Sequence, residues 1–447
     1  MYKKILIANR GEIALRVIRA CRQLGIKTVA IHSVADQASL HVKLADESVC
    51  VGPAEVSKSY LHVPSILSAA EVTGSDAIHP GYGFLAENHE FAERCEQCGV
   101  RFIGPTPKNI ELMGNKIKAK QLVEELDIPT IPGSTTKMKS EKEAVLVANE
   151  LGYPILLKAA LGGGGRGMRV IHNENELKKS LSLVRNEVLA HFGNPDIYIE
   201  KYLEGPRHIE VQIVADQHGT VLHLGERECS LQRNYQKILE EAPCAFLDQG
   251  IREKILRDAV RIASTIQYKN VGTIEFLVSG QDYYFIEMNT RIQVEHPVTE
   301  MVTGIDLIKT QIQVSLGEAL SWKQEDIHFN GHSMECRINA EDPETMMPFP
   351  GEIKDYHVPG GIGVRVDAAL YDGCSILPYY DSLIAKLIVH GDNRAEVINK
   401  MKHALNEYII GGIKTNIPLF KKILENPSFI GGEVNTSFLK RFLQKTT

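Results

Sequence analysis

Apolar runs and amphipathic stretches alternate along the first hundred residues of the chain. Residues 4–8 form a short apolar run, and residues 12–24 then carry apolar side chains at the spacing of one helix face. Gly25 is expected to end this helix, and residues 28–32 begin a second apolar run. A strand, a helix and a strand in this order predict a βαβ unit, and therefore a parallel sheet covered by helices.

The same alternation continues beyond this first unit. Residues 76–79 predict a strand, residues 86–98 a helix and residues 100–103 another strand. The turn at residues 9–12 holds a single glycine, so the dinucleotide-binding fingerprint is absent there. We therefore expect a Rossmann-like layer that does not bind NAD.

Clusters of structure-breaking residues divide the chain. Residues 104–107 read Gly-Pro-Thr-Pro, and the composition changes again near Gly331. The length of 447 residues, at about 150 residues per domain, predicts about three domains. We place the domains at residues 1–112, 113–330 and 331–447.

Composition and charge narrow the class of protein. Hydrophobic residues make up 43% of the chain and charged residues 24%, which is ordinary for a soluble globular protein. The 50 basic and 56 acidic residues give a net charge of −6, so nothing electrostatic favours a nucleic acid or an anionic membrane as a partner. No apolar run is long enough for a membrane span or a secretory signal. Eight scattered cysteines fit free thiols in a reducing compartment, and we expect a cytoplasmic protein.

The loop at residues 162–167 matches the pattern G-x-G-x-x-G, but its surroundings are not those of a dinucleotide-binding turn. It follows a strand-like run at residues 154–158 and leads into another at residues 168–171, instead of opening a helix. We interpret it as a hairpin flap whose backbone amides can wrap an anion, with Lys116 and Lys158 as candidates for additional charge against phosphates. A flexible loop without a ligand remains the alternative.

Two glutamates occupy positions that are unfavourable without a partner. The apolar runs on either side of Gly280 predict a β-hairpin, and a three-residue loop at residues 280–282 would place Glu275 directly opposite Glu287. Like charges opposed on a sheet are destabilising, and a divalent cation would turn the repulsion into coordination. Asn289 adds another oxygen, and an all-oxygen ligand set suits Mg²⁺ better than zinc. A loop of two or four residues, with the glutamates on opposite faces, remains the alternative.

Polar residues alternate along the segment that follows. Every second position from Glu287 to Glu295 is polar, which predicts an extended chain with these side chains on one face. Arg291 offers a bidentate fork for a planar oxyanion, and Glu295 is a candidate general base. An ordinary polar sheet surface is the alternative, but the position directly after the candidate metal ligands favours a site.

Taken together, these features resemble the ATP-grasp enzymes, and more narrowly the biotin carboxylases. The segments that carry the narrower resemblance are IANRGEI at residues 7–13, HPGYGFLAEN at 79–88, QK at 236–237 with EEAP at 240–243, ECRINAE at 335–341 and YDSLIAK at 380–386. They span nearly the whole chain in the order of the family.

The resemblance implies a mixed α/β fold with three domains. These are an N-terminal Rossmann-like domain, a central ATP-grasp domain with a hinged lid at about residues 132–203, and a C-terminal α+β domain that completes the biotin site. It also implies a reaction in which ATP phosphorylates bicarbonate to carboxyphosphate, which collapses to CO₂ and phosphate. Biotin, deprotonated at its ureido nitrogen, captures the CO₂. The implied metal ion is Mg²⁺ or Mn²⁺, with ATP as a substrate and biotin supplied on a carrier protein.

The resemblance further implies which residues perform these steps. The ATP-binding residues are Lys116, Lys158, Gly164, Gly165, Glu200, Lys201, Tyr202, Leu203, His208, Gln232, Glu275 and Glu287. The metal ligands are Glu275, Glu287 and Asn289, and the bicarbonate-binding residues are Lys237, Arg291, Gln293, Val294 and Glu295. Biotin is bound by Tyr82 and Arg337. The catalytic residues are Lys237, Arg291, Glu295 as general base, and Arg337 as the group that stabilises the biotin enolate.

One position departs from the family pattern, and one motif is missing. The chain reads Arg233-Asn234-Tyr235 where many members carry Arg-Arg-His, so a nucleotide contact made by that histidine is in doubt. The biotin attachment motif Ala-Met-Lys-Met does not occur, so we expect a separate biotin carboxyl carrier protein and carboxyltransferase subunits. The resemblance also implies a homodimer. Acetyl-CoA carboxylase is the complex we expect, while systems that act on other acyl-CoA esters, pyruvate or urea remain open.

Two other functions fit part of the pattern. The chain could be another ATP-grasp ligase that activates a different carboxylate, or a catalytically silent subunit that binds a nucleotide. A silent subunit is expected to have lost part of its acidic and basic residues, and here that set is complete.

Overall fold

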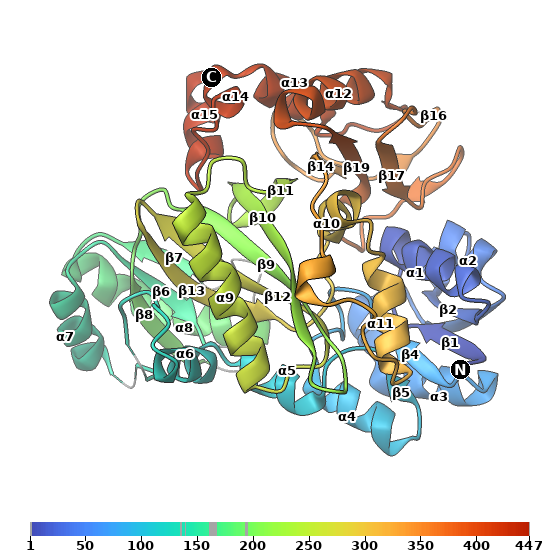
Figure 1. The fold of residues 1–447 in the computed structure, drawn as a ribbon, viewed down its shortest axis with the longest axis horizontal. Helices are drawn as coiled ribbons and strands as arrows, with labels where there is room; N and C mark the ends of the chain where they lie inside the picture. Colours follow the sequence, from blue (N-terminus) through green and yellow to red (C-terminus); the bar gives the residue numbers. More distant parts are fainter. Residues whose placement is uncertain (1, 135, 139, 161–167, 193–194, 447) are drawn as a thin grey trace.

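The computed structural model describes residues 2–134, 136–138, 140–160, 168–192 and 195–446 (Figure 1). Its N-terminal part is a five-stranded parallel sheet with the strand order β3-β2-β1-β4-β5. The strands are β1 (Lys4–Ile7), β2 (Lys27–Ser33), β3 (Glu47–Gly52), β4 (Ala77–His79) and β5 (Arg101–Phe102), and the helices include α1 (Gly11–Gln23), α2 (Leu40–Leu44), α3 (Val63–Thr73) and α4 (His89–Gln97). The predicted βαβ unit and parallel sheet are confirmed.

A second, smaller sheet has a hydrophobic core of its own. Its strands are β6 (Ile155–Ala159), β7 (Met168–Ile171) and β8 (Ile197–Lys201), in the antiparallel order β7-β6-β8, with helices α7 (Glu141–Leu151) and α8 (Glu174–Phe192). Apolar side chains of both helices and all three strands pack into one cluster. The antiparallel pairing of β6 with β7 agrees with the predicted hairpin. The glycine loop that joins them, with Gly164 and Gly165, lies outside the described residues.

The largest sheet has eight strands in the order β13-β12-β9-β10-β11-β14-β19-β17. Its first five are β13 (Asp282–Asn289), β12 (Asn270–Ser279), β9 (Arg207–Ala215), β10 (Val221–Arg233) and β11 (Gln236–Ala242). On β9, apolar and polar residues alternate, so Ile209, Val211 and Ile213 share one face. This face packs in one core with α9 (Gln249–Thr265) and α6 (Lys116–Glu125), while α5 (Pro107–Gly114) precedes α6. The opposite face of β9 carries polar side chains, and these belong to the candidate site.

The same sheet continues without a break into the C-terminal part of the chain. Strand β11 pairs with β14 (His332–Asn339), which pairs with β19 (Leu383–Gly391), and β17 (Val364–Ala368) forms the edge. Helices α12 (Arg394–Glu407), α13 (Ile417–Glu425), α14 (Pro427–Ile430) and α15 (Phe438–Thr446) lie at the top of Figure 1, where α12 packs against β14 and β19, and α15 against β10. Two short two-stranded sheets complete it: β15 (Gly351–Glu352) with β18 (Ser375–Ile376), and β16 (Tyr356–His357) with β20 (Ile409–Ile410).

The hairpin of β12 and β13 has a shorter loop than predicted, yet it pairs the two glutamates as predicted. Ser279 pairs with Asp282, so the loop has two residues and the predicted three-residue loop is wrong. Gly280 has a φ of +62°, the left-handed conformation that a short hairpin loop needs at its first central residue. A bulge further along the strands then shifts the register by one residue and pairs Glu275 with Glu287 after all.

The predicted extended chain through residue 295 is also wrong. Strand β13 ends at Asn289, the backbone bends at Arg291, and a turn at residues 294–295 leads into α10 (His296–Thr303). Pro297, in the first turn of this helix, explains the change, because its fixed φ suits a helix start. Glu295 is therefore the residue before a helix and not a member of a strand. Helix α11 (Leu307–Ser315) follows.

Two predictions from composition can be compared with the fold. All eight cysteines are free, as their scattered positions indicated. Among the helices that the structure describes, none combines the length and the apolar character that a membrane crossing requires.

Candidate active site

Three glutamates lie side by side across the polar face of the large sheet. Glu287 on β13 pairs with Glu275 on β12, Glu275 pairs with Glu210 on β9, and Glu210 pairs with Arg227 on β10. We call these four residues the glutamate rung. Directly opposed like charges destabilise a sheet, so the three carboxylates need cations between them.

Lys237 is the central cation of the rung. Its Nζ donates to Glu210, to Oε1 of Glu275 at 2.8 Å and to Oε1 of Glu295 at 2.7 Å. Burial lowers the pKa of Lys237, but the three carboxylates outweigh burial and raise the pKa well above its ordinary value. Lys237 therefore stays charged and joins the rung to Glu295.

Arg227 is the buried cation at the β10 end of the rung. Its side chain is fully buried, and Nε donates to Oε1 of Glu210 at 2.5 Å. Nη1 donates to Gln212 at 2.7 Å and to Thr299 at 2.9 Å, and Nη2 donates to Thr273 at 3.1 Å. Every donating group of Arg227 therefore has an acceptor, which is what a buried guanidinium requires.

Glu275 is the most heavily hydrogen-bonded carboxylate of the rung. Besides Lys237, Oε1 accepts from Asn289 at 2.8 Å and from Gln293 at 3.0 Å, and Oε2 lies 2.9 Å from Nε2 of His208. Burial raises the pKa of Glu275, but Lys237 and His208 outweigh it and hold the pKa well below its ordinary value. Glu275 is therefore ionised.

Glu295 joins the rung to the C-terminal half of the sheet. Its Oε2 accepts from Nη2 of Arg337 at 2.8 Å, and Nε of Arg337 donates to Glu240 at 2.6 Å. Burial raises the pKa of Glu295, but Lys237, Arg337 and Arg227 hold it well below its ordinary value. In this arrangement Glu295 is fully ionised and shared between two cations.

Arg291 occupies the bend after β13 and faces several acceptors at once. Nε donates to Glu87 at 2.9 Å, Nη1 to Gln293 at 2.8 Å and Nη2 to Asn289 at 3.1 Å. Val294 takes part through its carbonyl, which accepts from Nζ of Lys386 at 3.0 Å. Lys237, Arg291, Gln293 and Glu295 are thus linked through Glu275 in one polar network, while Val294 contacts Lys386.

The other described residues expected to bind the nucleotide lie at the start of α6, on the small sheet and just after it, and on β9 and β10. Nζ of Lys116 is 2.7 Å from Glu287, and Nζ of Lys158 donates to Glu200 at 2.9 Å in a buried pair. Nδ1 of His208 is 2.9 Å from the amide nitrogen of Gln232. Lys201, Tyr202 and Leu203 follow directly after Glu200 at the end of β8 and are half-buried.

Tyr82 and Tyr235 lie at different depths. The Tyr82 hydroxyl donates to Glu12, and its ring centroid is 6.0 Å from Nζ of Lys386. Burial, and then Glu12, raise the pKa of Tyr82 well above its ordinary value, so its hydroxyl keeps its proton. Tyr235 is 44% exposed at the tip of the hairpin between β10 and β11, with a φ of +65°.

The donor set of the rung fits a hard divalent cation. The paired carboxylates of Glu275 and Glu287 and the amide oxygen of Asn289 are all oxygen donors, which Mg²⁺ prefers. Glu287 is 24% exposed and Lys116 is its only ion-pair partner among the described residues, so it is the most accessible carboxylate of the rung. Nearby, ligand atoms of His208, Glu210 and Glu275 lie within 4.8 Å of one another.

Sequence reasoning missed several members of this network. Glu210 and Arg227 were not predicted, although polar residues at every second position of β9 were a usable signal. Arg227 carries no such signal, because its partners lie on two other strands and on α10. Glu240 and Lys386 lie within the segments that carry the family resemblance but were given no role.

Three family models match the chain in succession. Residues 1–110 match "Biotin carboxylase, N-terminal domain", residues 115–323 match "Carbamoyl-phosphate synthase L chain, ATP binding domain", and residues 335–441 match "Biotin carboxylase C-terminal domain". Together they cover most of the 447 residues.

Full-length relatives and solved structures agree with these matches. Biotin carboxylase 1 of Bacillus subtilis (strain 168) is 55% identical over 445 residues, which are 99% of each chain. The structure of a biotin carboxylase–β-γ-ATP complex from Campylobacter jejuni has a TM-score of 0.97 and 48% identity, with 99% of each chain covered. The biotin carboxylase domain dimer of Hydrogenobacter thermophilus 2-oxoglutarate carboxylase, in complex with MgADP, ADP and bicarbonate, has a TM-score of 0.96 and 50% identity, with 99% and 98% covered.

Proposed function

The chain belongs to the biotin carboxylase family, and from this premise we propose how its residues divide the work of the reaction. The enzyme carboxylates biotin with bicarbonate at the expense of ATP. Mg²⁺ and ATP belong to the reaction, and we propose Mn²⁺ as an alternative metal ion. The assignment of single residues below is our proposal, and the network around Glu295 is the observation that carries it.

ATP is held between the small sheet and the glutamate rung. We assign Lys116, Lys158, Gly164, Gly165, Glu200, Lys201, Tyr202, Leu203, His208 and Gln232, together with Glu275 and Glu287, to nucleotide binding. The support is that Lys116 and Lys158 are both paired to glutamates in a largely buried setting. A triphosphate brings negative charge that can take over these cations, so no new charge needs to be buried alone.

Glu275, Glu287 and Asn289 are the residues that would hold Mg²⁺. When bound, the ion neutralises charge on the phosphoryl oxygens during transfer. The role of the chain itself is to keep Glu275 ionised, which Lys237 and His208 do. It also keeps Glu287 opposite Glu275 through the register of β12 and β13.

Bicarbonate binds among Lys237, Arg291, Gln293, Val294 and Glu295. Without substrate, Glu295 is a weak base, because two cations hold its pKa far down. An anion that binds Lys237 removes part of that stabilisation and adds a like charge nearby, so the pKa of Glu295 rises. Glu295 then accepts the bicarbonate proton as ATP is attacked, so the substrate itself switches the base on.

Arg337 and Tyr82 form the biotin subsite. Nε and Nη2 of Arg337 are engaged by Glu240 and Glu295, and among the described residues no protein acceptor reaches Nη1. A positioned cation stabilises the enolate oxygen that develops when the ureido nitrogen of biotin loses its proton. The protonated hydroxyl of Tyr82 lies nearby, held by Glu12.

The partners follow from the same premise. We propose that biotin arrives on a separate biotin carboxyl carrier protein, that carboxyltransferase subunits use the product, and that the enzyme is a cytoplasmic homodimer without nucleic-acid or membrane partners. Support for the homodimer comes from the biotin carboxylase domain dimer of H. thermophilus. Acetyl-CoA is the acceptor we propose, and a 2-oxo acid is the second candidate because of the H. thermophilus enzyme.

The direct test is ADP release by the purified protein with Mg²⁺, bicarbonate and free biotin. We expect biotin to stimulate turnover, a chelator to abolish it, and Mg²⁺ or Mn²⁺ to restore it. Glu287→Gln should remove all turnover, whereas Arg337→Ala should remove only the stimulation by biotin. Turnover that biotin does not stimulate, that Arg337→Ala leaves intact and that Glu287→Gln abolishes would instead favour an ATP-grasp ligase that activates another carboxylate.

A further inference from the structure

A second pair of facing carboxyl groups lies outside the assigned residues. Glu240 on β11 and Glu335 on β14 are directly opposite each other, and both are fully buried. Such positions bring Cβ atoms to about 5 Å. Oε1 of Glu240 accepts from Arg337, but among the described residues nothing hydrogen-bonds to Oε2 of Glu240 or to either oxygen of Glu335.

The cations that act on this pair are already engaged elsewhere. Arg337 is shared between Glu240 and Glu295. Nζ of Lys386 donates to the Val294 carbonyl and lies 3.2 Å from Glu12. The titratable and charged groups around the pair are Arg337 and Cys336 on β14, Lys237 and Glu241 on β11, Cys229 on β10, Lys386 on β19, Asp367 on β17, Glu295 before α10, and Glu12 and Tyr82 from the N-terminal part. No second cation remains for Glu335 among these groups.

We propose that Glu240 and Glu335 form a proton-holding pair behind Arg337, in which Glu335 carries a proton at neutral pH and Glu240 is the ionised partner of Arg337. Two buried carboxylates this close cannot both ionise without a cation each. The pair acts as a set of positioning residues for biotin, because it fixes how much negative charge Arg337 faces. This role rests on the proposed biotin subsite, whereas the proton on Glu335 does not.

The pKa values agree with this division. Burial raises the pKa of Glu335 well above its ordinary value, and Lys386 only partly opposes it. Burial also raises the pKa of Glu240, to about 7, but Arg337 donates to this carboxyl at 2.6 Å and so favours its ionised form over that of Glu335. As the pH rises, ionisation of Glu335 adds a negative charge next to Arg337. Arg337 then stabilises a biotin enolate less well, so the pair contributes to the alkaline decline of biotin-dependent turnover.

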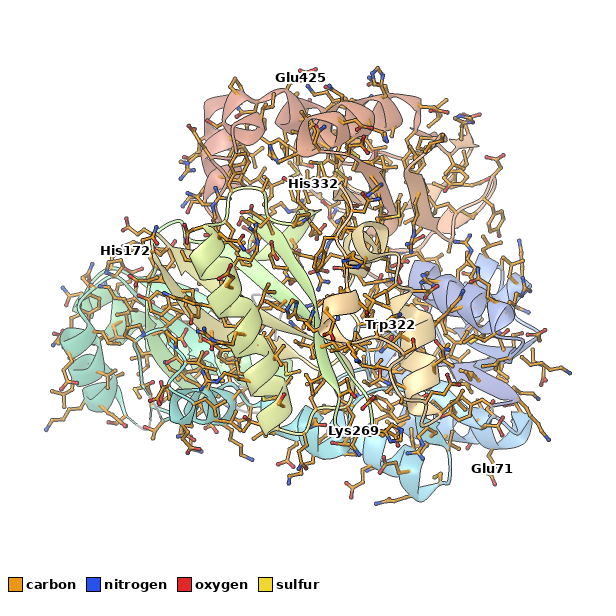
Figure 2. The ribbon with its side chains drawn as sticks, in the orientation of Figure 1. Glu71, His172, Lys269, Trp322, His332 and Glu425 are labelled. Atoms are coloured by element: carbon orange, nitrogen blue, oxygen red, sulfur yellow. The ribbon has the colours of Figure 1, made fainter. Side chains whose placement is uncertain are left out.

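Glu335→Gln tests the pair, because Gln has the size of the protonated acid and cannot ionise. Glu240→Gln removes the ionised partner of Arg337 instead. Glu241→Gln is the matched control: Glu241 is the next residue on β11, and its partners are His332, labelled in Figure 2, and Arg394. Infrared difference spectra of the substrate-free proteins report protonated carboxyl groups, and the pH profile of kcat and of KM for biotin reports the effect on the reaction.

We expect the wild-type spectrum at neutral pH to contain a protonated carboxyl band that Glu335→Gln removes and that Glu240→Gln and Glu241→Gln retain. Glu335→Gln should also move the alkaline limb of biotin-dependent turnover upward by about one pH unit or more, mainly through KM for biotin. Glu241→Gln should lower thermal stability without moving that limb.

The proposal is overturned if Glu335→Gln leaves the carboxyl band in place or leaves the alkaline limb where it is. Failure of Glu335→Gln to fold also contradicts it, because an uncharged isostere should fit a site built for the protonated acid. The infrared measurement needs no substrate. A protein with the band and without biotin-dependent turnover would therefore refute the proposed function and not the pair.

Discussion

Arg227 provides a test of how the glutamate rung is held together. The guanidinium is fully buried and donates to Glu210, Gln212, Thr273 and Thr299. Arg227→Met keeps much of the apolar volume and removes every one of these donors. Glu210, which is also fully buried, then keeps only Lys237 of its two cations.

The expected loss follows from these contacts. Removing one partner of a buried ion pair costs about 3–5 kcal/mol, because the other charge stays buried. The side-chain oxygen of Gln212 loses its donor as well, and an unsatisfied buried acceptor costs about 1–3 kcal/mol. Lys237 still neutralises part of the charge on Glu210, which reduces the first amount. We therefore expect the free energy of unfolding to fall by about 4 kcal/mol.

Urea denaturation measures this loss, and hydrogen exchange of the β9 and β10 amides shows whether it is local. Arg257→Met is the control, because that side chain is 62% exposed and should lose less than about 0.5 kcal/mol. The double variant Arg227→Met/Glu210→Gln removes both charges and should recover about half of the loss. The reasoning is refuted if the single variant loses less than about 1 kcal/mol, or if the double variant is no more stable than the single one.

Three further predictions concern the reaction and its pH range. Glu295→Gln should lower biotin-dependent kcat/KM by about 10²–10⁴-fold. The urea midpoint should change little, because Lys237 keeps two carboxylate partners and Arg337 keeps Glu240. A small kinetic effect would exclude Glu295 as the base. The free energy of unfolding should fall as the pH drops below about 6.5. Burial lowers the pKa of His41 to about 4 and the pKa of His79 to about 3, so the unfolded chain takes up more protons than the folded chain in this range. A flat profile between about pH 6.5 and 4 would contradict this sign. Tyr235→His introduces the histidine that the family resemblance implies at this exposed position. It should lower KM for ATP by about two- to tenfold, with kcat and the melting temperature unchanged. An unaltered KM would show that this position makes no nucleotide contact.

Local patterns predicted the N-terminal elements and part of the site. The apolar run and helix spacing at the N-terminus gave the βαβ unit, because local periodicity decides such elements. The facing of Glu275 and Glu287 was predicted correctly from a wrong loop length, since a bulge between the strands compensated for the shorter loop. Bulges depend on twist and packing of the whole sheet, which no local pattern records.

Long-range contacts could not be predicted from the sequence. Arg227 reaches Thr299, which is 72 positions away, and Glu240 faces Glu335 only because β11 and β14 happen to be neighbours in the sheet. The predicted extended chain up to Glu295 failed for a related reason. The alternating polar residues after Asn289 satisfy partners on several elements, and helix α10 overrides the strand pattern.

The unbroken pairing of β11 with β14 determines which parts of this enzyme can be exchanged with a relative. The unit of β6, β7 and β8 has its own core, so a chimera that replaces it should keep the reacting groups in place. A graft that begins near β14 cuts through a continuous ladder of backbone hydrogen bonds. It must reproduce the register that sets Glu335 against Glu240, because a slip of one residue would turn Arg337 to the opposite face.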